Sequence, residues 1–107
     1  MVPIVPSFPT GTVVLLMSDI EGPTRLISTV GDAFPGLLGE HRAIMRKSIA
    51  DQHGMVVSTE GYSFFAVFPS VRLAVNAGIN AQRALADHLW PGEARVKVRL
   101  GSMPGRP

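Results

Sequence analysis

Cysteine is missing from this sequence of 107 residues, so neither a disulfide nor a thiolate metal site can stabilise the chain. Charged residues are sparse at 17%, and the ten lysines and arginines outnumber the acidic residues by only two. The basic residues form no run, which argues against a nucleic-acid partner. The longest apolar run, TVVLLM from Thr12 to Met17, is far shorter than the roughly 20 residues of a membrane-spanning helix, and no charged region precedes it as in a signal peptide. These absences predict a cytoplasmic protein without a membrane or nucleic-acid partner.

Hydrophobic residues make up 46% of the sequence, which is typical of a compact globular chain and, at this length, allows one domain with a modest core. Residues 1–11, MVPIVPSFPTG, hold three prolines and predict an extended leader. We expect the domain to cover residues 12–102 and a short tail to cover residues 103–107.

The first half of the domain alternates strand and helix signals. The β-branched apolar run that starts at Thr12 predicts a strand buried on both faces. Gly22 ends it, and Pro23 suits the first position of a short helix because the amide that proline lacks would be unpaired there. Apolar residues spaced three and four apart then predict an amphipathic helix from Asp32 to about Gln52.

The second half predicts a hairpin, a helix and a last strand. MVVST and YSFFAVF are joined at Glu60-Gly61 as a hairpin. Ser70 is a candidate N-cap for a helix whose inner face carries mostly small residues, namely Ala74, Ala77, Gly78, Ala81, Ala84, Leu85 and His88. Residues 95–102 alternate basic and apolar side chains, as a half-exposed strand does. This order predicts an α+β fold, a ferredoxin-like βαββαβ sheet with helices packed on one face.

Two polar residues stand out by position. Asp19 ends the first strand and Tyr62 begins the second strand of the hairpin. These strands are neighbours in a ferredoxin-like sheet, so the two side chains are expected to face one cleft. A carboxylate at such a place is suited to Mg²⁺, which binds through one or two carboxylates and substrate phosphates. The alternative is that Asp19 only caps the following helix.

Three stretches carry a family resemblance. GTVVLLMSDIEGPTRL resembles the FxFTDIEGSTRL opening of class III adenylate and guanylate cyclase catalytic domains. VVSTEGYSFFAVFPS resembles the family's VVKTTGDGFFAVFPS, and the segment that ends in ARVKVRLGSMPG is similar to VRVRMGLHTGE. The resemblance covers residues 11–105. It implies the conversion of ATP or GTP to a cyclic nucleotide and pyrophosphate, with Mg²⁺ or Mn²⁺ as cofactor.

The resemblance also implies roles for individual residues. Asp19 and the backbone carbonyl of Ile20 match metal ligands of the family. Backbone amides of the stretch from Glu21 through Gly22 to Thr24 match those that hold phosphate oxygens, a common use of a helix N-terminus.

The sequence departs from the family at the chemistry. Tyr62 stands where the family has its second metal aspartate, and a neutral phenol cannot replace a carboxylate that neutralises Mg²⁺. Ser58 stands at the base-reading lysine, Pro23 at a serine and Met103 at a histidine. The family's later strands, with an asparagine and an arginine that act across a dimer, have no counterpart here. We therefore expect a truncated, inactive cyclase homology domain in which metal binding is weak or absent.

The resemblance implies assembly as well, because family members work as dimers. We expect a homodimer, or a heterodimer with a cyclase-like chain, and weak nucleotide binding. The alternative function is a non-catalytic regulatory or dimerisation module that binds a partner cyclase or a nucleotide.

Overall fold

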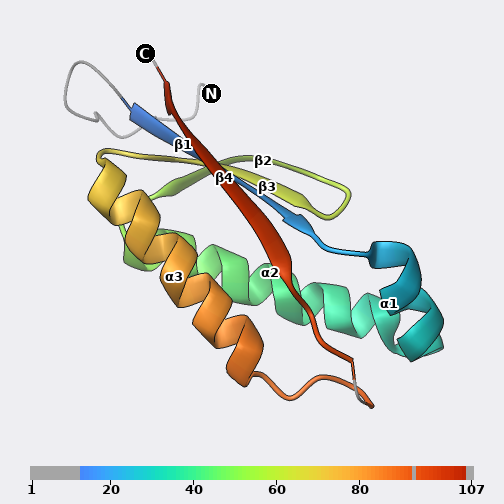
Figure 1. The fold of residues 1–107 in the computed structure, drawn as a ribbon. Helices are drawn as coiled ribbons and strands as arrows, with labels where there is room; N and C mark the ends of the chain where they lie inside the picture. Colours follow the sequence, from blue (N-terminus) through green and yellow to red (C-terminus); the bar gives the residue numbers. More distant parts are fainter. Residues whose placement is uncertain (1–12, 93, 106–107) are drawn as a thin grey trace, which may run out of the picture.

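The computed structural model describes residues 13–92 and 94–105, whose strands form one antiparallel sheet (Figure 1). The strands are β1 (Val13–Ile20), β2 (Met55–Glu60), β3 (Ser63–Phe68) and β4 (Val98–Gly105). They lie in the order β2-β3-β1-β4, with β1 paired to both β3 and β4. This order places β1 at the centre and β4 at one edge of the sheet.

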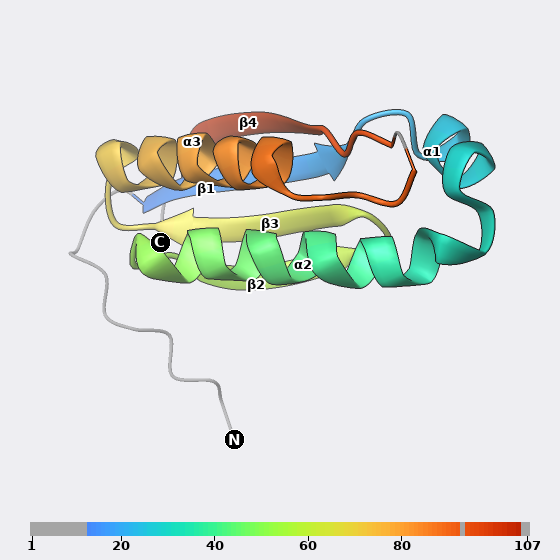
Figure 2. The same cartoon turned by 90° about the horizontal axis from the view of Figure 1, so that it is seen from below.

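The helices of the described residues are α1 (Pro23–Val30), α2 (Phe34–Asp51) and α3 (Val71–Asp87), with a short 3₁₀ turn, Gly31–Ala33, before α2. Figure 2 shows α2 and α3 covering one face of the sheet, while α1 lies beyond the end of β1. The predicted ferredoxin-like α+β fold and its order of elements are confirmed.

The core lies between the sheet and the two long helices. Its buried side chains come from all the layers, among them Leu16, Ile20, Leu37, Met45, Phe64, Phe68, Ala77 and Leu85. Small residues let α3 approach the sheet closely, since a Cβ added to Gly78 would lie 3.2 Å from Leu100. Ala84, which we predicted on this inner face, is exposed instead.

β1 is buried on one face only, so the prediction of a strand buried on both faces is wrong. Its burial alternates along the strand: Val14, Leu16, Ser18 and Ile20 are buried, and the residues between them are half-buried. The reason is that both long helices pack on the same side of the sheet. The other side is an open face of half-covered side chains, and Asp19 lies on it.

β4 begins later and ends later than predicted. Residues 95–97 approach the sheet without strand pairing, although Val96 is buried and its two neighbours are exposed. The strand then runs through Gly105, so that the backbone of Met103, which we assigned to a tail, pairs with Leu15. The predicted leader, residues 1–11, lies outside the described residues.

The hairpin turn is shifted by one residue from its predicted position. Glu60 pairs with Ser63, so Gly61 and Tyr62 form the two-residue turn and Tyr62 is not the first residue of the strand. Gly61 has a φ of 57°, a value that glycine adopts readily. Arg42 of α2 donates a hydrogen bond through Nη2 to the carbonyl oxygen of Gly61 at 3.1 Å. On β2, the register shifts between Val56 and Ser58, which leaves Val57 as a bulge.

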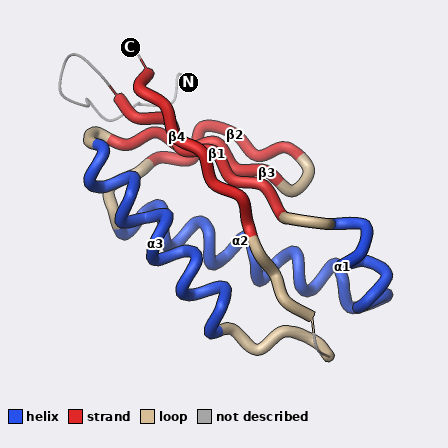
Figure 3. Tube along the Cα trace, in the orientation of Figure 1, coloured by secondary structure: helices blue, strands red, loops and turns tan. Residues whose placement is uncertain are grey.

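The segment that follows β1 and the segment that precedes β4 are in contact next to Asp19. Figure 3 shows the loop from β1 to α1 and the segment that leads into β4 at the same end of the sheet. The amide of Glu21 donates to the carbonyl oxygen of Lys97 at 2.8 Å, which fixes them together. No described helix combines the length and the apolar character needed to cross a membrane.

Candidate active site

The candidate site is built around Asp19, at the end of the central strand. Its direct partners in the sheet are Ser63 of β3 and Arg99 of β4. Arg99 Nη2 lies 2.7 Å from Asp19 Oδ2, and Ser63 Oγ donates to Asp19 Oδ1 at 3.4 Å. Both carboxylate oxygens therefore have a partner from the protein. The two charged side chains are partly open to solvent, with 66% of Arg99 and 44% of Asp19 exposed.

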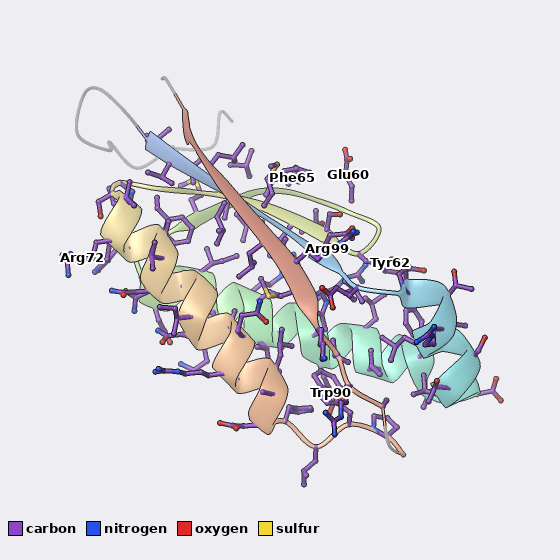
Figure 4. The ribbon with its side chains drawn as sticks, in the orientation of Figure 1. Glu60, Tyr62, Phe65, Arg72, Trp90 and Arg99 are labelled. Atoms are coloured by element: carbon purple, nitrogen blue, oxygen red, sulfur yellow. The ribbon has the colours of Figure 1, made fainter. Side chains whose placement is uncertain are left out.

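Tyr62 does not join this group. Its ring packs edge-on against Phe34 at the start of α2, with 5.7 Å between ring centroids and 88° between the ring planes. Figure 4 shows Tyr62 and Arg99 at the same end of the sheet, near the turn between β2 and β3. The residue that reaches Asp19 from β3 is Ser63, because the turn ends at Tyr62 and the strand starts one residue later. The structure therefore does not bring Asp19 and Tyr62 into contact.

Ser58 lies on the open face but in a different row of the sheet. It pairs with Phe65 of β3, which pairs in turn with Met17 of β1. Ser58 is half-buried, and its cross-strand neighbour on β3 is Phe65, which is labelled in Figure 4. A short hydroxyl in this position has little reach towards a base held beside Asp19.

The stretch after Asp19 has fewer free amides than we expected. Ile20 is fully buried and pairs with Val98. The amide of Glu21 is used by the carbonyl oxygen of Lys97, and Pro23 has no amide hydrogen. The amides of Gly22 and Thr24 remain for an anion at the start of α1. Gly22 caps this helix in the left-handed region, with φ of 54°, and its carbonyl oxygen accepts from Leu26.

A surface pocket of about 730 Å³ lies beside this helix start. Its lining includes Gly22 and Thr24, one acidic side chain, Glu21, and three basic side chains, Arg25, Arg95 and Lys97. All three are exposed and line the pocket, so the positive charge there exceeds the single negative charge of Glu21. Positive charge and free amides at the N-terminus of a helix favour an anion such as a polyphosphate.

The donor set around Asp19 does not fit the two metal ions that the resemblance implies. Divalent Mg²⁺ or Mn²⁺ needs several oxygen ligands, with carboxylates to balance its charge. Glu60 is in the same row of the sheet but two strands from Asp19, about 10 Å at the usual strand spacing. Among residues 13–92 and 94–105, no group of three or more His, Cys, Asp or Glu side chains could hold a metal ion. Asp19 is the one carboxylate at the end of β1, and the guanidinium of Arg99 is hydrogen-bonded to it.

Sequence reasoning missed Arg99 and Ser63 as members of the site. The alternation of residues 95–99 predicts which side Arg99 faces, and Val96 and Val98 confirm it by their burial. What the sequence does not contain is the register between β1 and β4 that sets Arg99 directly opposite Asp19. The cross-strand partner could therefore be found only once the sheet was known.

The histidines play no part in this site. His41 is fully buried in the core, His53 is exposed at the end of α2, and His88 lies after α3 within 3.3 Å of Glu40. His41 lies on α2, and His53 and His88 lie in the segments that follow α2 and α3.

The proteins similar to this chain are adenylate and guanylyl cyclases, although no family model matches the chain. An adenylate cyclase of Lachancea kluyveri is 33% identical over 85 residues, which are 79% of this chain and 5% of that protein. A solved adenylate cyclase from Trypanosoma brucei, described in its monomeric state, superposes with a TM-score of 0.85 at 22% identity and covers 94% of this chain and 59% of its own. A dimeric guanylyl cyclase domain from Blastocladiella emersonii superposes with a TM-score of 0.77 at 16% identity, over 89% of this chain and 58% of its own.

The chain thus matches about one twentieth of the length of that curated relative and somewhat over half of the solved domains. The sequence match and the shared fold agree with the motifs DIEG and FFAVF, which lie on β1 and β3 and the residues next to them. In sequence and in fold, this chain is a homologue of the catalytic domain of class III adenylate and guanylate cyclases.

Proposed function

We propose that this chain is a cyclase homology domain that does not convert ATP or GTP to a cyclic nucleotide on its own. The observation that carries the proposal is the composition of the site at Asp19: one carboxylate, paired with Arg99, with the hairpin's Glu60 two strands away. In the family's reaction the ribose 3′-hydroxyl attacks the α-phosphate and pyrophosphate leaves. Such phosphoryl chemistry depends on positioning and on neutralising the charge that develops on the phosphate oxygens.

Each group at the end of β1 bears on that requirement. Asp19 is engaged through both oxygens, so it offers little to a metal ion. Tyr62 packs its ring on Phe34 and adds no negative charge. Ser58 provides no long donor that could select a base. The chain therefore has the scaffold of a cyclase site without the charges that would activate the hydroxyl.

Weak nucleotide binding remains part of the proposal. The pocket beside α1 offers the amides of Gly22 and Thr24 and the cations of Arg25, Arg95 and Lys97. These groups suit the phosphates of a nucleotide rather than its base. Because all the basic side chains are exposed, their attraction for phosphates should weaken as salt is added.

An activity assay tests the proposed lack of turnover. The purified chain is incubated with ATP or GTP and Mg²⁺ or Mn²⁺, and cyclic nucleotide and pyrophosphate are measured by liquid chromatography with mass spectrometry. We expect neither product above the level of a boiled sample. Cyclic product that disappears in Asp19→Ala would refute the proposal, whereas product that persists in Asp19→Ala would identify a contaminating cyclase.

A second candidate function, a dimerisation module, is favoured by the edge of the sheet at β4. Among the described residues no strand pairs with β4 on the side away from β1. Beside it, a groove of about 480 Å³ between α3 and β4 is lined by apolar side chains that include Val75, Ile79 and Leu100. Val75 is 50% exposed and Ile79 is 44% exposed. An open strand edge next to an apolar groove favours pairing with another chain.

We commit to a second copy of this chain as the occupant. A strand edge can pair with the same edge of a copy around a two-fold axis, and closed symmetric pairs are the commonest oligomers. Part of the edge is already used, because Gln82 of α3 donates through Nε2 to the carbonyl oxygen of Val98 at 3.1 Å. Pairing should therefore centre on Leu100 and Ser102, whose backbone groups point outward by alternation, because Pro104 at the next outward position has no amide hydrogen.

Light scattering over a dilution series tests this module. Wild-type chain should form a dimer at micromolar concentration, and Ile79→Glu should shift it to monomer by placing a charge in the groove. Val57→Glu is the matched control, since Val57 is 59% exposed on the opposite edge of the sheet. A wild-type monomer at high micromolar concentration, or equal effects of the two substitutions, would rule out the β4 dimer.

A further inference from the structure

The open face of the sheet carries an apolar patch on its two central strands. Leu15 of β1 pairs with Val67 of β3, and Met17 pairs with Phe65 in the next row. These four side chains are half-buried, although no described helix lies over them, as Figure 2 shows. On β4 the partner of Met17 is Gly101, which adds no side chain to the row. An apolar sheet face without a second layer favours burial against another segment.

The segment that precedes β1 repeats proline at every third position. Residues 2–9 read VPIVPSFP, and residues 1–12 hold no charged side chain. Proline fixes φ near the value of a polyproline II helix, which has three residues per turn. The prolines therefore share one side of such a helix, and Val2, Val5 and Phe8 share another. The sequence thus favours an extended segment with a continuous apolar side.

This segment is suited to a sheet face rather than a sheet edge. Proline has no amide to donate, so a segment with proline at every third position pairs poorly as a further strand. Side-chain contacts across a face need no such donor. The absence of charged side chains removes the cost of desolvating an ion there. Because φ of each proline is already fixed, the segment also loses less entropy when it docks.

The length of the segment matches the patch. Gly11 allows the chain to reverse just before β1. Val5 and Met17 each lie six residues from Gly11, a length of about 19 Å in a polyproline II helix and about 20 Å in a strand. A reversal at Gly11 therefore directs Val5 to the row of Met17. Phe8, three residues nearer to the reversal, is directed towards the row of Leu15.

We propose that residues 2–9 fold back at Gly11 and cover the patch with Val5 and Phe8. The direct connection to β1 keeps the local concentration of this segment at the face high, which favours it over a separate molecule. The cover depends neither on nucleotide turnover nor on a dimer through β4, because the edge of β4 stays free. It gives the open face of this chain an occupant from the chain itself.

Hydroxyl-radical oxidation read by mass spectrometry tests the cover in the full chain. Met17 reports on the patch, and Met45, which is 1% exposed beneath the helices, is the internal reference. If the cover is in place at least half of the time, its loss at least about doubles the exposed time of Met17. Val5→Asp places a charge against the apolar patch, so we expect Met17 to oxidise at least about twofold faster and Met45 to stay unchanged.

Ile4→Asp is the matched control, because it adds the same charge one residue earlier on a different side of the polyproline II helix. Both substitutions precede β1 and leave the core intact. In wild type we also expect nuclear Overhauser contacts between the Phe8 ring and the Leu15 side chain, which Val5→Asp should remove. Equal oxidation of Met17 in wild type and Val5→Asp, or an equal rise in both variants, would overturn the proposal. Protection of Met17 that disappears on dilution would also overturn it, because a second copy would then be the occupant.

Discussion

His41 lies edge-on against Phe64 in the core, with 5.8 Å between ring centroids and 73° between the ring planes. The histidine comes from α2 and the phenylalanine from β3, so the pair joins the helix layer to the sheet. Neither imidazole nitrogen has a hydrogen-bond partner in the described structure. An imidazole in this setting is stable only while it is neutral.

The first prediction is a loss of stability in mild acid. Burial, and then the charge of Arg42, lower the pKa of His41 from 6.5 to about 4. The unfolded chain therefore binds the proton more readily between these values, and the free energy of unfolding should rise with pH through this range. Above pH 6.5 the neutral His41 costs the folded state nothing. As pH falls from 6.5 towards 4, the free energy of unfolding should decrease by about 3 kcal/mol in total.

Urea unfolding at several pH values measures this dependence. His41→Leu keeps an apolar side chain in the core and removes the titration, so its stability should change less between pH 7 and pH 4.5 than that of the wild type. Because the imidazole nitrogens are unpaired, the substitution should cost little at neutral pH. Parallel pH curves for the two proteins would contradict the assignment to His41.

The second prediction concerns Tyr62→Asp, which restores the acidic residue of the family motif. We expect no marked gain in Mn²⁺ affinity, because position 62 lies in the turn against Phe34 and not beside Asp19, no cyclic nucleotide, and a loss of stability of about 1 to 2 kcal/mol from the missing contact with Phe34. Titration calorimetry and urea unfolding measure the two effects. Tyr62→Phe is the control, since it keeps the ring and adds no ligand. Turnover by Tyr62→Asp alone would show that one carboxylate was all that the site lacked.

Gly54→Ala is the third prediction. A Cβ at this position would meet the Phe68 ring and the Ile49 side chain at less than 3.0 Å, closer than real Cβ atoms approach their neighbours. The overpacked core should lose about 1 to 3 kcal/mol of unfolding free energy. Gly39→Ala on α2 provides the contrast, because nothing lies within 4 Å of its added Cβ and alanine favours a helix. Equal melting temperatures of the two variants would argue against a close approach at Gly54.

The fourth prediction tests the start of α3. Ser70 Oγ accepts a hydrogen bond from the amide of Leu73 at 3.3 Å and so caps the helix. Ser70→Ala should lower stability by about 1 kcal/mol, the usual cost of losing such a cap. Ser28→Ala, at an exposed position on α1, should change stability by less than about 0.5 kcal/mol. A thermal shift of the same size in both variants would indicate that the cap contributes nothing of its own.

Local sequence patterns were enough to predict the helices and strands, whereas the contacts of the candidate site depend on pairing between strands that are far apart in the sequence. The spacing of Leu37, His41 and Met45 needs only the helical repeat, and all three are buried as that repeat requires. The contacts of Asp19 need the registers of two strand pairs, which depend on a turn shifted by one residue and on how β4 enters the sheet. A one-residue change of register turns a side chain to the other face, which is why Ser63 and not Tyr62 reaches Asp19.

β1 shows a different limit of sequence reasoning. A continuous apolar run suits a strand covered on both sides, yet the helices of this chain cover one side only. The apolar residues of the other side, Leu15 and Met17 among them, are half-buried by their neighbours within the sheet. Hydropathy reports how apolar a side chain is, and the arrangement of the layers decides whether anything lies over it.

The bulge at Val57 makes the two borders of the sheet unequal. β4 continues its pairing with β1 through Gly105 without a shift of register, whereas β2 is interrupted next to Val57. A bulge strengthens the local twist and spoils a strand as a template for another chain. If two copies join through β4, each copy's β2 becomes an outer border of the joined sheet, and both borders carry the bulge. Growth should then stop at two chains. The open edge of β4 favours association, and the bulge on β2 prevents further copies from extending the sheet into a fibre.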